Sequence, residues 1–286
     1  MILDCHVHYF SVDYLQNLDR FVRIKESRDY LKDGISAKLA QLDISEATPR
    51  TYFETVRQQV DQAVLFGLAD HPEGCRQLND QVAQLCRAHP DRLFGFGTIP
   101  LPDLDMAKEE MVRLKESLNF AGIKIYPSLS RLTFKSEPVK KVLEYAAVLD
   151  LIVLTDCSFA CWGAPDYFGS DNKFYHLIES LSEVEFRPRI IAAHLGGGLA
   201  YFKDLYTWSH GNNHFDTIWF DLSPFFPPSM IRAAVEVVSA DRLLFGSDFP
   251  ISSGQKMLNN MDSIDLSEQQ KEKILWRNAY HLLEIE

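Results

Sequence analysis

Residues 2–8 read ILDCHVH, a short run that begins apolar and ends with two histidines in three positions. Seven further runs of this kind follow along the chain, each mostly apolar and closed by polar residues or glycine. Few of them alternate cleanly between apolar and polar residues, which is typical of strands buried on both faces. The eight runs are Ile2–His8, Gln62–Ala69, Leu93–Pro100, Phe120–Pro127, Leu151–Cys157, Arg189–Gly196, Ile218–Ser223 and Leu243–Pro250.

Helix-like stretches lie between these runs. In Glu73–His89, for example, the apolar residues Leu78, Val82 and Leu85 recur at spacings of three and four. A strand followed by a helix, repeated eight times, predicts an α/β fold, a (β/α)8 TIM barrel, as a single domain over residues 1–286. An open doubly wound sheet is the rival fold, but no glycine-rich nucleotide loop supports it. The other predicted helices are Met106–Leu118, Pro138–Leu149 and Pro228–Ser239.

Two connections are longer than a single crossover helix requires. They run from Tyr9 to Asp61, after the first strand, and from Ser158 to Pro188, after the fifth strand. Loops that follow barrel strands lie at the carboxyl end of the barrel, where active sites are found in this fold. We therefore expect the insertions after strands 1 and 5 to form an active-site lid.

Charge and cysteine content restrict the partners and the compartment. The net charge of -11 argues against a nucleic-acid partner, because neutralising phosphates needs an excess of lysine and arginine. No apolar window approaches the length of about 18 residues that a membrane-spanning helix needs, and residues 1–6, MILDCH, do not resemble a secretory signal. The five cysteines show no CxxC spacing, which favours free thiols in the cytoplasm. A small-molecule substrate is the expected partner, and a homo-oligomer is left open.

The first run places His6 and His8 two positions apart near its end. Side chains at such positions of a strand point to the same side, so the two imidazoles are expected to share one volume inside the barrel. Two histidines at the carboxyl end of a strand form a ready chelate for zinc or a similar ion. The alternative is a pair of hydrogen-bonded core histidines, which a place at the end of the first barrel strand disfavours.

The last run, LLFGSDFP at residues 243–250, closes with the carboxylate of Asp248. A carboxylate that closes an apolar strand is costly unless it pairs or binds a cation. Because the first and last strands are neighbours in a closed barrel, Asp248 is expected to reach the ion held by His6 and His8. It is also expected to act as the base that deprotonates a metal-bound water. A capping aspartate in a tight turn is the alternative.

The sixth run ends in AAHLGGG at residues 192–198, so that glycines follow His194. Glycine allows the backbone to approach closely, and exposed amides there suit an anion. His194 is interpreted either as a metal ligand or as a general acid or base that polarises the substrate. Asp221 and Ser223 close the seventh run and are expected to orient His194 or the substrate.

Three further residues lie in the two predicted lids: Trp162, Arg23 and Arg28. An aromatic ring and an arginine suit a planar substrate that carries a carboxylate. Ordinary lid packing is the more common role for such residues, so they remain minor candidates for substrate contact.

Several of these motifs together resemble the amidohydrolase superfamily. The resemblance rests on DxHxH at residues 4–8, GIKIYP at 122–127, HLGG at 194–197, GSDFP at 246–250 and RNAxxLL at 277–283. The motifs keep their order over almost the whole chain, and the closest branch is the amidohydrolase-related group that includes the aminocarboxymuconate-semialdehyde decarboxylase type. The resemblance implies a metal-dependent barrel whose relatives hydrolyse C–N or C–O bonds, decarboxylate or hydrate.

One departure concerns the fifth strand, which in similar proteins ends in a histidine that binds the metal. Here the alignment with those proteins puts Asp156 in that place. A carboxylate makes the metal shell richer in oxygen and more favourable to Mn²⁺ or Mg²⁺. Asp156 is therefore expected to be a fourth ligand. The alternatives are that it packs or pairs with a neighbour such as Lys124, or that the metal is weakened or lost.

Lys124 lies in the GIKIYP motif, in which Tyr126 replaces the histidine that similar proteins carry. The resemblance allows a carboxylated lysine between two metals, a lysine in direct contact with the substrate, or a structural ion pair. The resembling branch generally binds one metal, so we expect one divalent ion, Zn²⁺ first, with Mn²⁺ or Mg²⁺ as alternatives. The expected substrate residues are Lys124, Tyr126, Trp162 and Asp221.

Three functions compete on these residues. The leading hypothesis is a metal-dependent hydrolase of a small, carboxylate-bearing substrate, in which Asp248 takes a proton from water and His194 polarises the substrate carbonyl. The first alternative is a decarboxylase, or carboxy-lyase, that acts on a small unsaturated or aromatic acid with the same ligands. The second is a metal-free, inactive binding barrel, which the departure at Asp156 keeps open. The expected metal ligands are His6, His8, Asp156 and Asp248.

Overall fold

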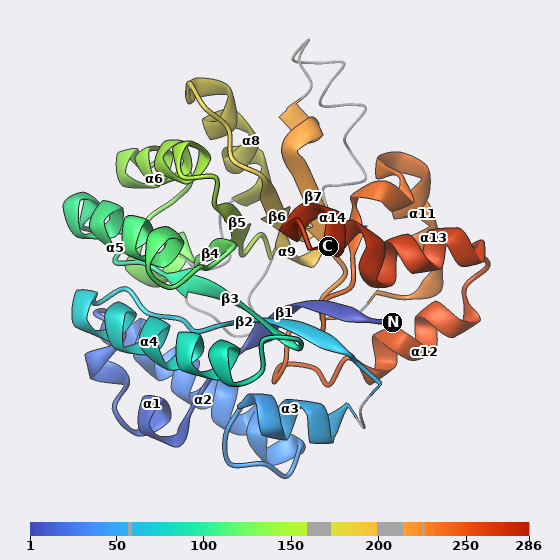
Figure 1. The fold of residues 1–286 in the computed structure, drawn as a ribbon, viewed down its shortest axis with the longest axis horizontal. Helices are drawn as coiled ribbons and strands as arrows, with labels where there is room; N and C mark the ends of the chain where they lie inside the picture. Colours follow the sequence, from blue (N-terminus) through green and yellow to red (C-terminus); the bar gives the residue numbers. More distant parts are fainter. Residues whose placement is uncertain (57–58, 159–172, 199–213, 225, 286) are drawn as a thin grey trace.

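The described part of the computed structural model contains eight parallel strands that follow one another around one sheet in chain order (Figure 1). The predicted order of barrel strands is thereby confirmed. The strands are β1 Leu3–His8, β2 Gln62–Phe66, β3 Leu93–Thr98, β4 Gly122–Ile125, β5 Ile152–Thr155, β6 Ile190–Ala192, β7 Ile218–Asp221 and β8 Leu243–Leu244. The structure describes residues 1–56, 59–158, 173–198, 214–224 and 226–285.

Helices cover the outer face of the sheet (Figure 1). The four helices predicted from apolar spacing are α4, α5, α6 and α11, each within two residues of its predicted ends. No helix among the described residues is long and apolar enough to cross a membrane. The α-helices are α1 Val12–Gln16, α2 Lys25–Gln41, α3 Pro49–Thr55, α4 Pro72–Ala88, α5 Leu104–Glu116, α6 Glu137–Val148, α8 Lys173–Glu183, α9 Ala193–Gly197, α11 Pro228–Val238, α12 Gln255–Ser263, α13 Glu268–Glu272 and α14 Asn278–Leu283. The short 3₁₀ segments are η1 Leu18–Arg20, η2 Pro127–Ser130, η4 His214–Thr217 and η5 Ala240–Arg242, and η6 Lys273–Arg277 is a π-helical turn between α13 and α14.

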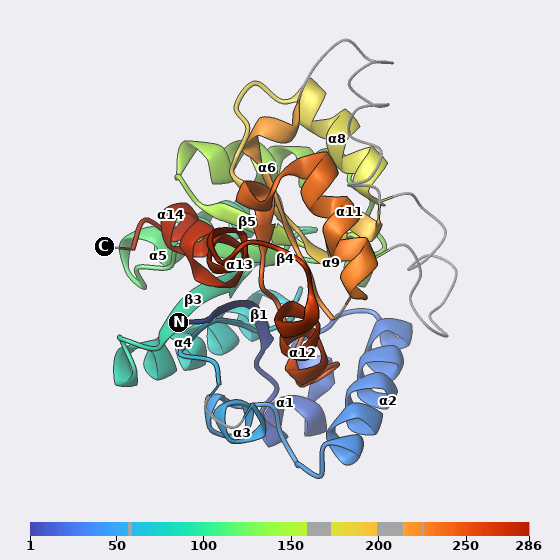
Figure 2. The ribbon, with the colours of Figure 1, turned by 90° about the vertical axis from the view of Figure 1, so that its right-hand side faces the viewer.

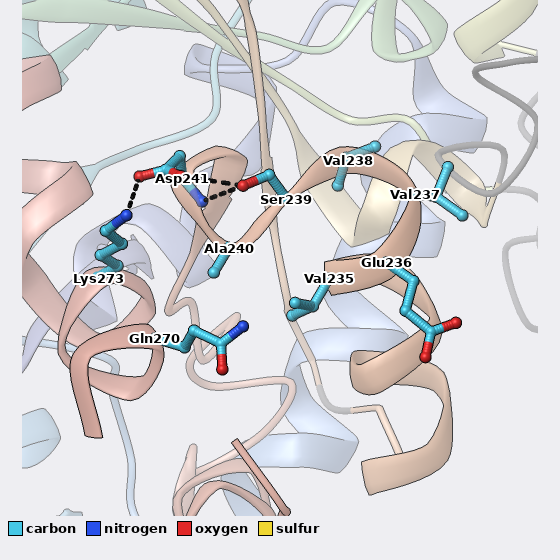
Figure 3. A pocket seen from close by; sticks show the side chains of 9 residues that line it. All are labelled: Val235, Glu236, Val237, Val238, Ser239, Ala240, Asp241, Gln270 and Lys273. Carbon is cyan, nitrogen blue, oxygen red and sulfur yellow. Dashed lines mark hydrogen bonds and ion pairs between the residues drawn. The ribbon is translucent and has the colours of Figure 1, made fainter. Parts of the chain in front are cut away.

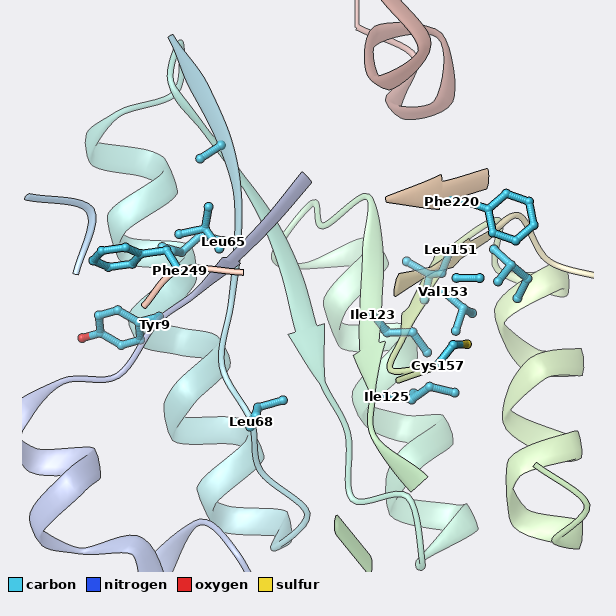
Figure 4. Close-up of a cluster of buried hydrophobic side chains, with 14 of the residues drawn as sticks. Tyr9, Leu65, Leu68, Ile123, Ile125, Leu151, Val153, Cys157, Phe220 and Phe249 are labelled. Atoms are coloured by element: carbon cyan, nitrogen blue, oxygen red, sulfur yellow. The ribbon is translucent and has the colours of Figure 1, made fainter. Parts of the chain in front are cut away.

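Alternation along the strands sorts side chains into an outer and an inner layer. Ile123 and Ile125 of β4 pack outward, between the strands and the surrounding helices (Figure 4). Phe66 of β2 and Leu154 of β5 belong to a second apolar cluster, inside the barrel. Lys124 lies between the two outward isoleucines, so its side chain enters the interior, where its Nζ lies 5.0 Å from the centre of the Phe66 ring.

The barrel is nearly closed where its first and last strands meet. The β8 ladder spans two residues, but the chain that follows it runs along β1. The Asp248 amide donates to the His6 carbonyl oxygen at 2.9 Å, and the His8 amide donates to the Phe249 carbonyl oxygen at 3.0 Å. Gly246 makes this approach possible, because a Cβ atom there would lie only 3.1 Å from the Cβ atom of His6. This seam brings the two ends of the chain together.

All eight strands are shorter than the runs in the sequence, and β6 and β8 fall furthest short. β6 ends at Ala192, because residues 194–196 have left-handed φ values of 60°, 52° and 60°, which a strand does not adopt. After β8 the chain also turns, with a φ of 61° at Asp248. The side chains of His194 and Asp248 therefore sit on turns at the carboxyl ends of their strands, not on the strands themselves.

The two predicted lids differ in how far the structure describes them. The insertion after β1 forms α1, η1, α2 and α3, and the Ser27 hydroxyl of α2 donates to the Leu129 carbonyl oxygen of η2 at 2.9 Å. This contact puts α2 beside the segment that follows β4, and its lid role stays a prediction. Most of the insertion after β5, with Trp162, lies outside the described residues. Both chain ends lie toward one side of the barrel and α9 lies on the other (Figure 2).

Candidate metal centre

Three ligand atoms meet at the seam between β1 and β8. The Nε2 atoms of His6 and His8 lie 3.3 Å apart. The Oδ1 atom of Asp248 lies 3.0 Å from His8 Nε2 and 3.3 Å from His6 Nε2. Among the described residues, these three form the group of histidine, cysteine and carboxylate side chains that is compact enough to hold a metal ion. The sequence-based expectation that Asp248 reaches the two histidines is confirmed.

The spacing and the protonation of these atoms both suit a metal. Ligands about 2.0–2.2 Å from an ion lie about 2.8–3.6 Å from one another at right or tetrahedral angles, and the three separations fall in that range. Burial lowers the pKa of His8 from 6.5 to about 4, and burial with the charge of Lys124 also lowers the pKa of His6. Both imidazoles are therefore neutral near pH 7, as metal binding requires.

Asp221, at the end of β7, fixes the orientation of His6. Its Oδ2 atom lies 2.8 Å from His6 Nδ1, which leaves Nε2 free to face His8 and Asp248. Burial alone would raise the pKa of Asp221, but the hydrogen bonds from His6 and Ser223, with the charge of His194, hold this pKa below the usual range. A carboxylate behind the ring is the usual arrangement that orients a metal-binding histidine. Asp221 was predicted to orient His194 or the substrate, and it touches His194 as well, through the backbone amide at 3.0 Å.

Asp4 ties the two halves of the seam together without joining the ligand group. Its Oδ1 atom accepts from the amides of His6 at 2.9 Å and Ser247 at 3.0 Å. Its Oδ2 atom accepts from the Tyr52 hydroxyl of α3 at 2.5 Å. Burial raises the pKa of Asp4 to about 6, although these donors oppose the shift. Asp4 thus holds the backbone before His6 against the backbone before Asp248.

Asp156 lies elsewhere, in an arrangement of opposite charges next to β5. Its Oδ2 atom accepts from the ammonium of Lys173, the first residue of α8, and its Oδ1 atom lies 3.3 Å from His194 Nε2. Burial alone would raise the pKa of Asp156, but the charge of Lys173 and the hydrogen bond of His194 hold it well below the usual range. The expectation that Asp156 is a fourth metal ligand is not tested by this geometry and stays a prediction.

His194 is held by hydrogen bonds on several sides. Its Nδ1 atom lies 3.0 Å from the hydroxyl oxygen of Ser223 and 3.1 Å from the carbonyl oxygen of the same residue. Burial works against protonation, but the hydrogen bond and charge of Asp156, with the charges of Asp248 and Asp221, raise the pKa of His194 from 6.5 to about 9. Its ring centre lies 5.4 Å from that of His6, so His194 borders the ligand group.

Lys124 joins the metal ligands to a small cavity. Its Nζ atom lies 3.3 Å from His6 Nε2, and burial lowers its pKa although three nearby carboxylates oppose the shift. The same lysine and Tyr126 line the cavity together with Asp70 and Ser130, whose side chains are joined by a hydrogen bond of 2.6 Å. Two of the predicted substrate residues therefore border one polar space beside the ligands.

Two other features among the described residues lie apart from the metal ligands. A surface cavity of about 280 Å³ is lined by the end of α11, by η5 and by Gln270 and Lys273 (Figure 3). Because η5 directly precedes β8, this cavity lies at the amino end of the strand, away from Asp248. Arg28, in the first predicted lid, donates to the carbonyl oxygens of Val22 at 2.9 Å and Arg23 at 2.7 Å. Its guanidinium thus stabilises the insertion itself.

Sequence reasoning missed two residues of this region, Lys173 and Tyr52. Lys173 lies in the long insertion after β5, at the start of an amphipathic stretch, where a lysine ordinarily faces solvent. Tyr52 lies in the insertion after β1, and nothing in the local pattern links it to Asp4, which is 48 residues away. Both contacts depend on how insertions fold back, which short-range periodicity does not record.

Comparison with known proteins places the chain in a family. Residues 3–285 match the amidohydrolase family. The curated gamma-resorcylate decarboxylase of Polaromonas sp. is 22% identical to this chain, over 89% of the chain and 91% of that protein. The relative of Rhizobium sp., which bears the same name, is 23% identical over 75% of this chain and 77% of its own length.

Solved structures show the same fold. A dihydroxybenzoic acid decarboxylase from Polaromonas sp., with bound manganese and the inhibitor 2-nitroresorcinol, superimposes with a TM-score of 0.76 at 17% identity, over 99% of this chain and 96% of that one. A 5-carboxyvanillate decarboxylase from Sphingomonas paucimobilis gives 0.77 at 16% identity, over 100% of this chain and 99% of that one.

These findings correct two expectations. The leading hypothesis of a hydrolase is wrong, because the curated relatives that match most of the chain are decarboxylases of aromatic acids, which supports the carboxy-lyase alternative. The preference for zinc has no support, since a solved relative holds manganese. The sequence motifs, the barrel fold and the family match agree on the family of the chain. The chain belongs to the amidohydrolase family of enzymes, in the branch similar to aminocarboxymuconate-semialdehyde decarboxylase.

Proposed function

We propose that this protein is a metal-dependent decarboxylase that removes carbon dioxide from a small aromatic acid. The observation that carries the proposal is the match to gamma-resorcylate decarboxylase along 89% of the chain, in a protein whose described residues bring His6, His8 and Asp248 together. The ligand group alone does not separate decarboxylation from hydrolysis, because both reactions use such sites. The relatives therefore support the reaction, and the geometry supports the roles that we propose for individual residues.

His6, His8 and Asp248 would hold one divalent ion, for which manganese is the first candidate. An ion held there would supply a positive charge to bind substrate oxygens and to stabilise the negative charge left on the ring by decarboxylation. The role of Asp248 as a base for water falls with the hydrolase hypothesis, and its role as a ligand remains. Asp221 and Asp4 keep the ligands in register, by holding the His6 ring and the two backbones of the seam.

Lys124 and Tyr126 are proposed to bind the substrate. An ammonium group buried beside His6 attracts an anion, and a carboxylate on a flat ring would match its charge. Burial that lowers the pKa of Lys124 also makes its charge responsive to what binds nearby. Trp162 keeps its place as a predicted substrate residue from the insertion after β5.

The reaction exchanges a carboxylate for a proton: the aromatic carboxylate and one proton give the aromatic ring and carbon dioxide. A proton donor must therefore stand near the ring. His194 is proposed for this role, because its pKa of about 9 keeps it protonated near pH 7 and its ring lies 5.4 Å from that of His6. Ser223 orients it through Nδ1.

Carbon dioxide release tests the proposal. Protein stripped of metal and reloaded with Mn²⁺ should release carbon dioxide from 2,6-dihydroxybenzoate or 5-carboxyvanillate within a panel of hydroxylated aromatic acids, and stripping the metal should stop the release. The panel includes benzoate as the matched acid without a hydroxyl group. Mn²⁺-loaded protein that binds these acids and releases no carbon dioxide from any of them would contradict the proposal.

A further inference from the structure

Asp156 stands where relatives of this branch are expected to carry a metal-binding histidine, yet both of its carboxylate oxygens are already in use. Oδ2 accepts from Lys173. Oδ1 faces His194 Nε2 at 3.3 Å and accepts from the Ser158 amide at 3.3 Å. The side chain is 5% exposed, so water does not compete for these oxygens. Each carboxylate oxygen has two lone pairs, so a metal ion could still approach Oδ2, but it would have to share that oxygen with the ammonium of Lys173.

The hydrogen bonds around His194 require a proton on both of its ring nitrogens. The Ser223 hydroxyl donates to Asp221 Oδ1 at 2.6 Å, so toward His194 Nδ1 it offers only a lone pair, as does the Ser223 carbonyl. Nδ1 is therefore a donor. Nε2 faces the carboxylate of Asp156, which only accepts, so Nε2 is a donor as well. His194 is an imidazolium, and Asp156 lies between two cations.

Lys173 and Asp156 form a buried ion pair. The lysine is 7% exposed, and its Nζ atom also lies 3.3 Å from the Ser158 hydroxyl oxygen and 5.4 Å from the centre of the Tyr126 ring. A buried ammonium that is drawn away from a carboxylate loses an attraction that burial strengthens. Moving Asp156 onto a metal would therefore cost this charge contact.

We propose that Lys173 is a positioning residue that withholds Asp156 from the metal, so that, among the described residues, the ligands are His6, His8 and Asp248. Asp156 serves instead to hold His194. Two neutral imidazoles and one carboxylate would bring a single negative charge to a divalent ion. An ion held there would keep a net positive charge, which suits the anionic oxygens of a substrate. This inference rests on the proposed metal centre, and not on the reaction that the centre serves.

Metal affinity of variants tests the inference without any measurement of activity. Metal-free protein is titrated with Mn²⁺ against a chelating dye. Asp156→Asn should change the dissociation constant by less than about tenfold, the lower bound for residues outside the ligand set, whereas Asp248→Asn should raise it by more than about a hundredfold. Co²⁺-loaded Asp156→Asn should also keep the visible absorption spectrum of the wild type, which reports the ligand set directly.

Lys173 is tested by the charge that it supplies. Lys173→Met frees one oxygen of Asp156 and should tighten Mn²⁺ binding by about tenfold or more and change the Co²⁺ spectrum. Lys173→Arg, which keeps the charge, should behave as the wild type, and the double variant Lys173→Met with Asp156→Asn should lose the gain. If Lys173→Met does not fold, the Asp156→Asn titration and the Lys173→Arg spectrum still decide.

Two results would overturn the inference. The first is a loss of Mn²⁺ in Asp156→Asn as large as in Asp248→Asn, which would make Asp156 a ligand. The second is unchanged metal affinity in a folded Lys173→Met variant, which would show that Lys173 does not withhold the carboxylate. Failure to release carbon dioxide would leave both titrations standing. A wild type that binds no Mn²⁺ would overturn the metal centre and this inference together.

Discussion

The two sides of the carboxyl edge of the barrel use the same residue types in opposite ways. At the seam of β1 and β8, His6, His8 and Asp248 bring three ligand atoms within 3.3 Å of one another, and burial keeps the imidazoles neutral. Next to β5 and β6, the carboxylate of Asp156 is enclosed by Lys173 and a protonated His194. Histidine and aspartate thus form a candidate metal site at the seam of β1 and β8. Next to β5 and β6 they form part of a buried cluster of paired charges.

The difference lies in what faces the outer nitrogen, Nε2, of each ring. The inner nitrogens of both rings face acceptors, the Asp221 carboxylate for His6 and the Ser223 oxygens for His194, so Nδ1 carries a proton in both. Nε2 of His6 lies 3.3 Å from the ammonium of Lys124, a donor, which leaves this nitrogen as an electron-pair donor, whereas Nε2 of His194 faces the Asp156 carboxylate, which requires a proton there. The partner of the outer nitrogen thus decides whether each histidine can bind a metal or holds a second proton.

The largest expected effect is the loss of the metal from the seam. The double change His6→Ala and His8→Ala removes two of three ligands, and we expect the metal content to fall from about one ion per chain to none. The matched control replaces the exposed His89 and His281 by alanine and should keep the metal. Elemental analysis of both proteins, purified without chelators, gives the answer, and an undiminished metal content in the first would remove the seam from consideration as the site.

A large effect on turnover with no loss of metal is expected on the other side. His194→Asn keeps a side chain of similar polarity and removes the proton donor, so kcat for carbon dioxide release should fall about a hundredfold or more while the metal content stays unchanged. His89→Asn serves as the control. Loss of metal in His194→Asn would show that His194 is itself a metal ligand, and would contradict the proposed difference between the two histidine sites.

A smaller effect is expected from the support beneath the seam. Tyr52→Phe removes the hydroxyl that donates to Asp4 at 2.5 Å and leaves a buried carboxylate oxygen without that donor. We expect a loss of about 1–3 kcal/mol in the free energy of unfolding, with the metal retained. Tyr280→Phe is the control, because the Tyr280 hydroxyl donates to the partly exposed Gln62 at 2.7 Å. Its loss should lower the free energy of unfolding by less. Urea denaturation measures both, and equal losses would show that the Asp4 contact has no special weight.

The smallest expected effect is a dependence of stability on pH from His194. Its pKa is raised from 6.5 to about 9 on folding, so the stabilising contribution is complete below pH 6.5 and is lost as the pH rises through 9. In metal-free protein, the urea midpoint of the wild type should fall between pH 6.5 and 9 by more than that of His194→Gln. If the urea midpoints of the two proteins fell equally with pH, His194 would not be protonated in the folded protein.

The sequence predicts the barrel well because parallel strands buried on both faces leave apolar runs that a reader can count. It also predicts the seam, because two histidines in alternate positions of the first strand and a carboxylate after the last one must meet when the barrel closes. The short extent of β6 and the left-handed turn at His194 are only hinted at by the glycines of HLGGG at residues 194–198.

The sequence alone predicts neither the contact of Asp156 with Lys173 nor the reaction. The contact of Asp156 with Lys173 joins a strand end to an insertion that has no periodic signal, and the motifs suggested Lys124 as the partner instead. The reaction was also out of reach, because hydrolases and decarboxylases of this family use the same ligand types. Only the relatives that match along most of the chain separated the two.

The seam has a consequence for folding. Two of the metal ligands come from residues 6 and 8 and the third from residue 248, so the site joins the two ends of a chain of 286 residues. Contacts between such distant positions carry the largest entropy of loop closure and tend to form after local ones. A chain that is still being synthesised therefore cannot assemble the metal site until its last strand has emerged. Capture of an ion would therefore coincide with closure of the barrel, and metal uptake would report that its first and last strands have met.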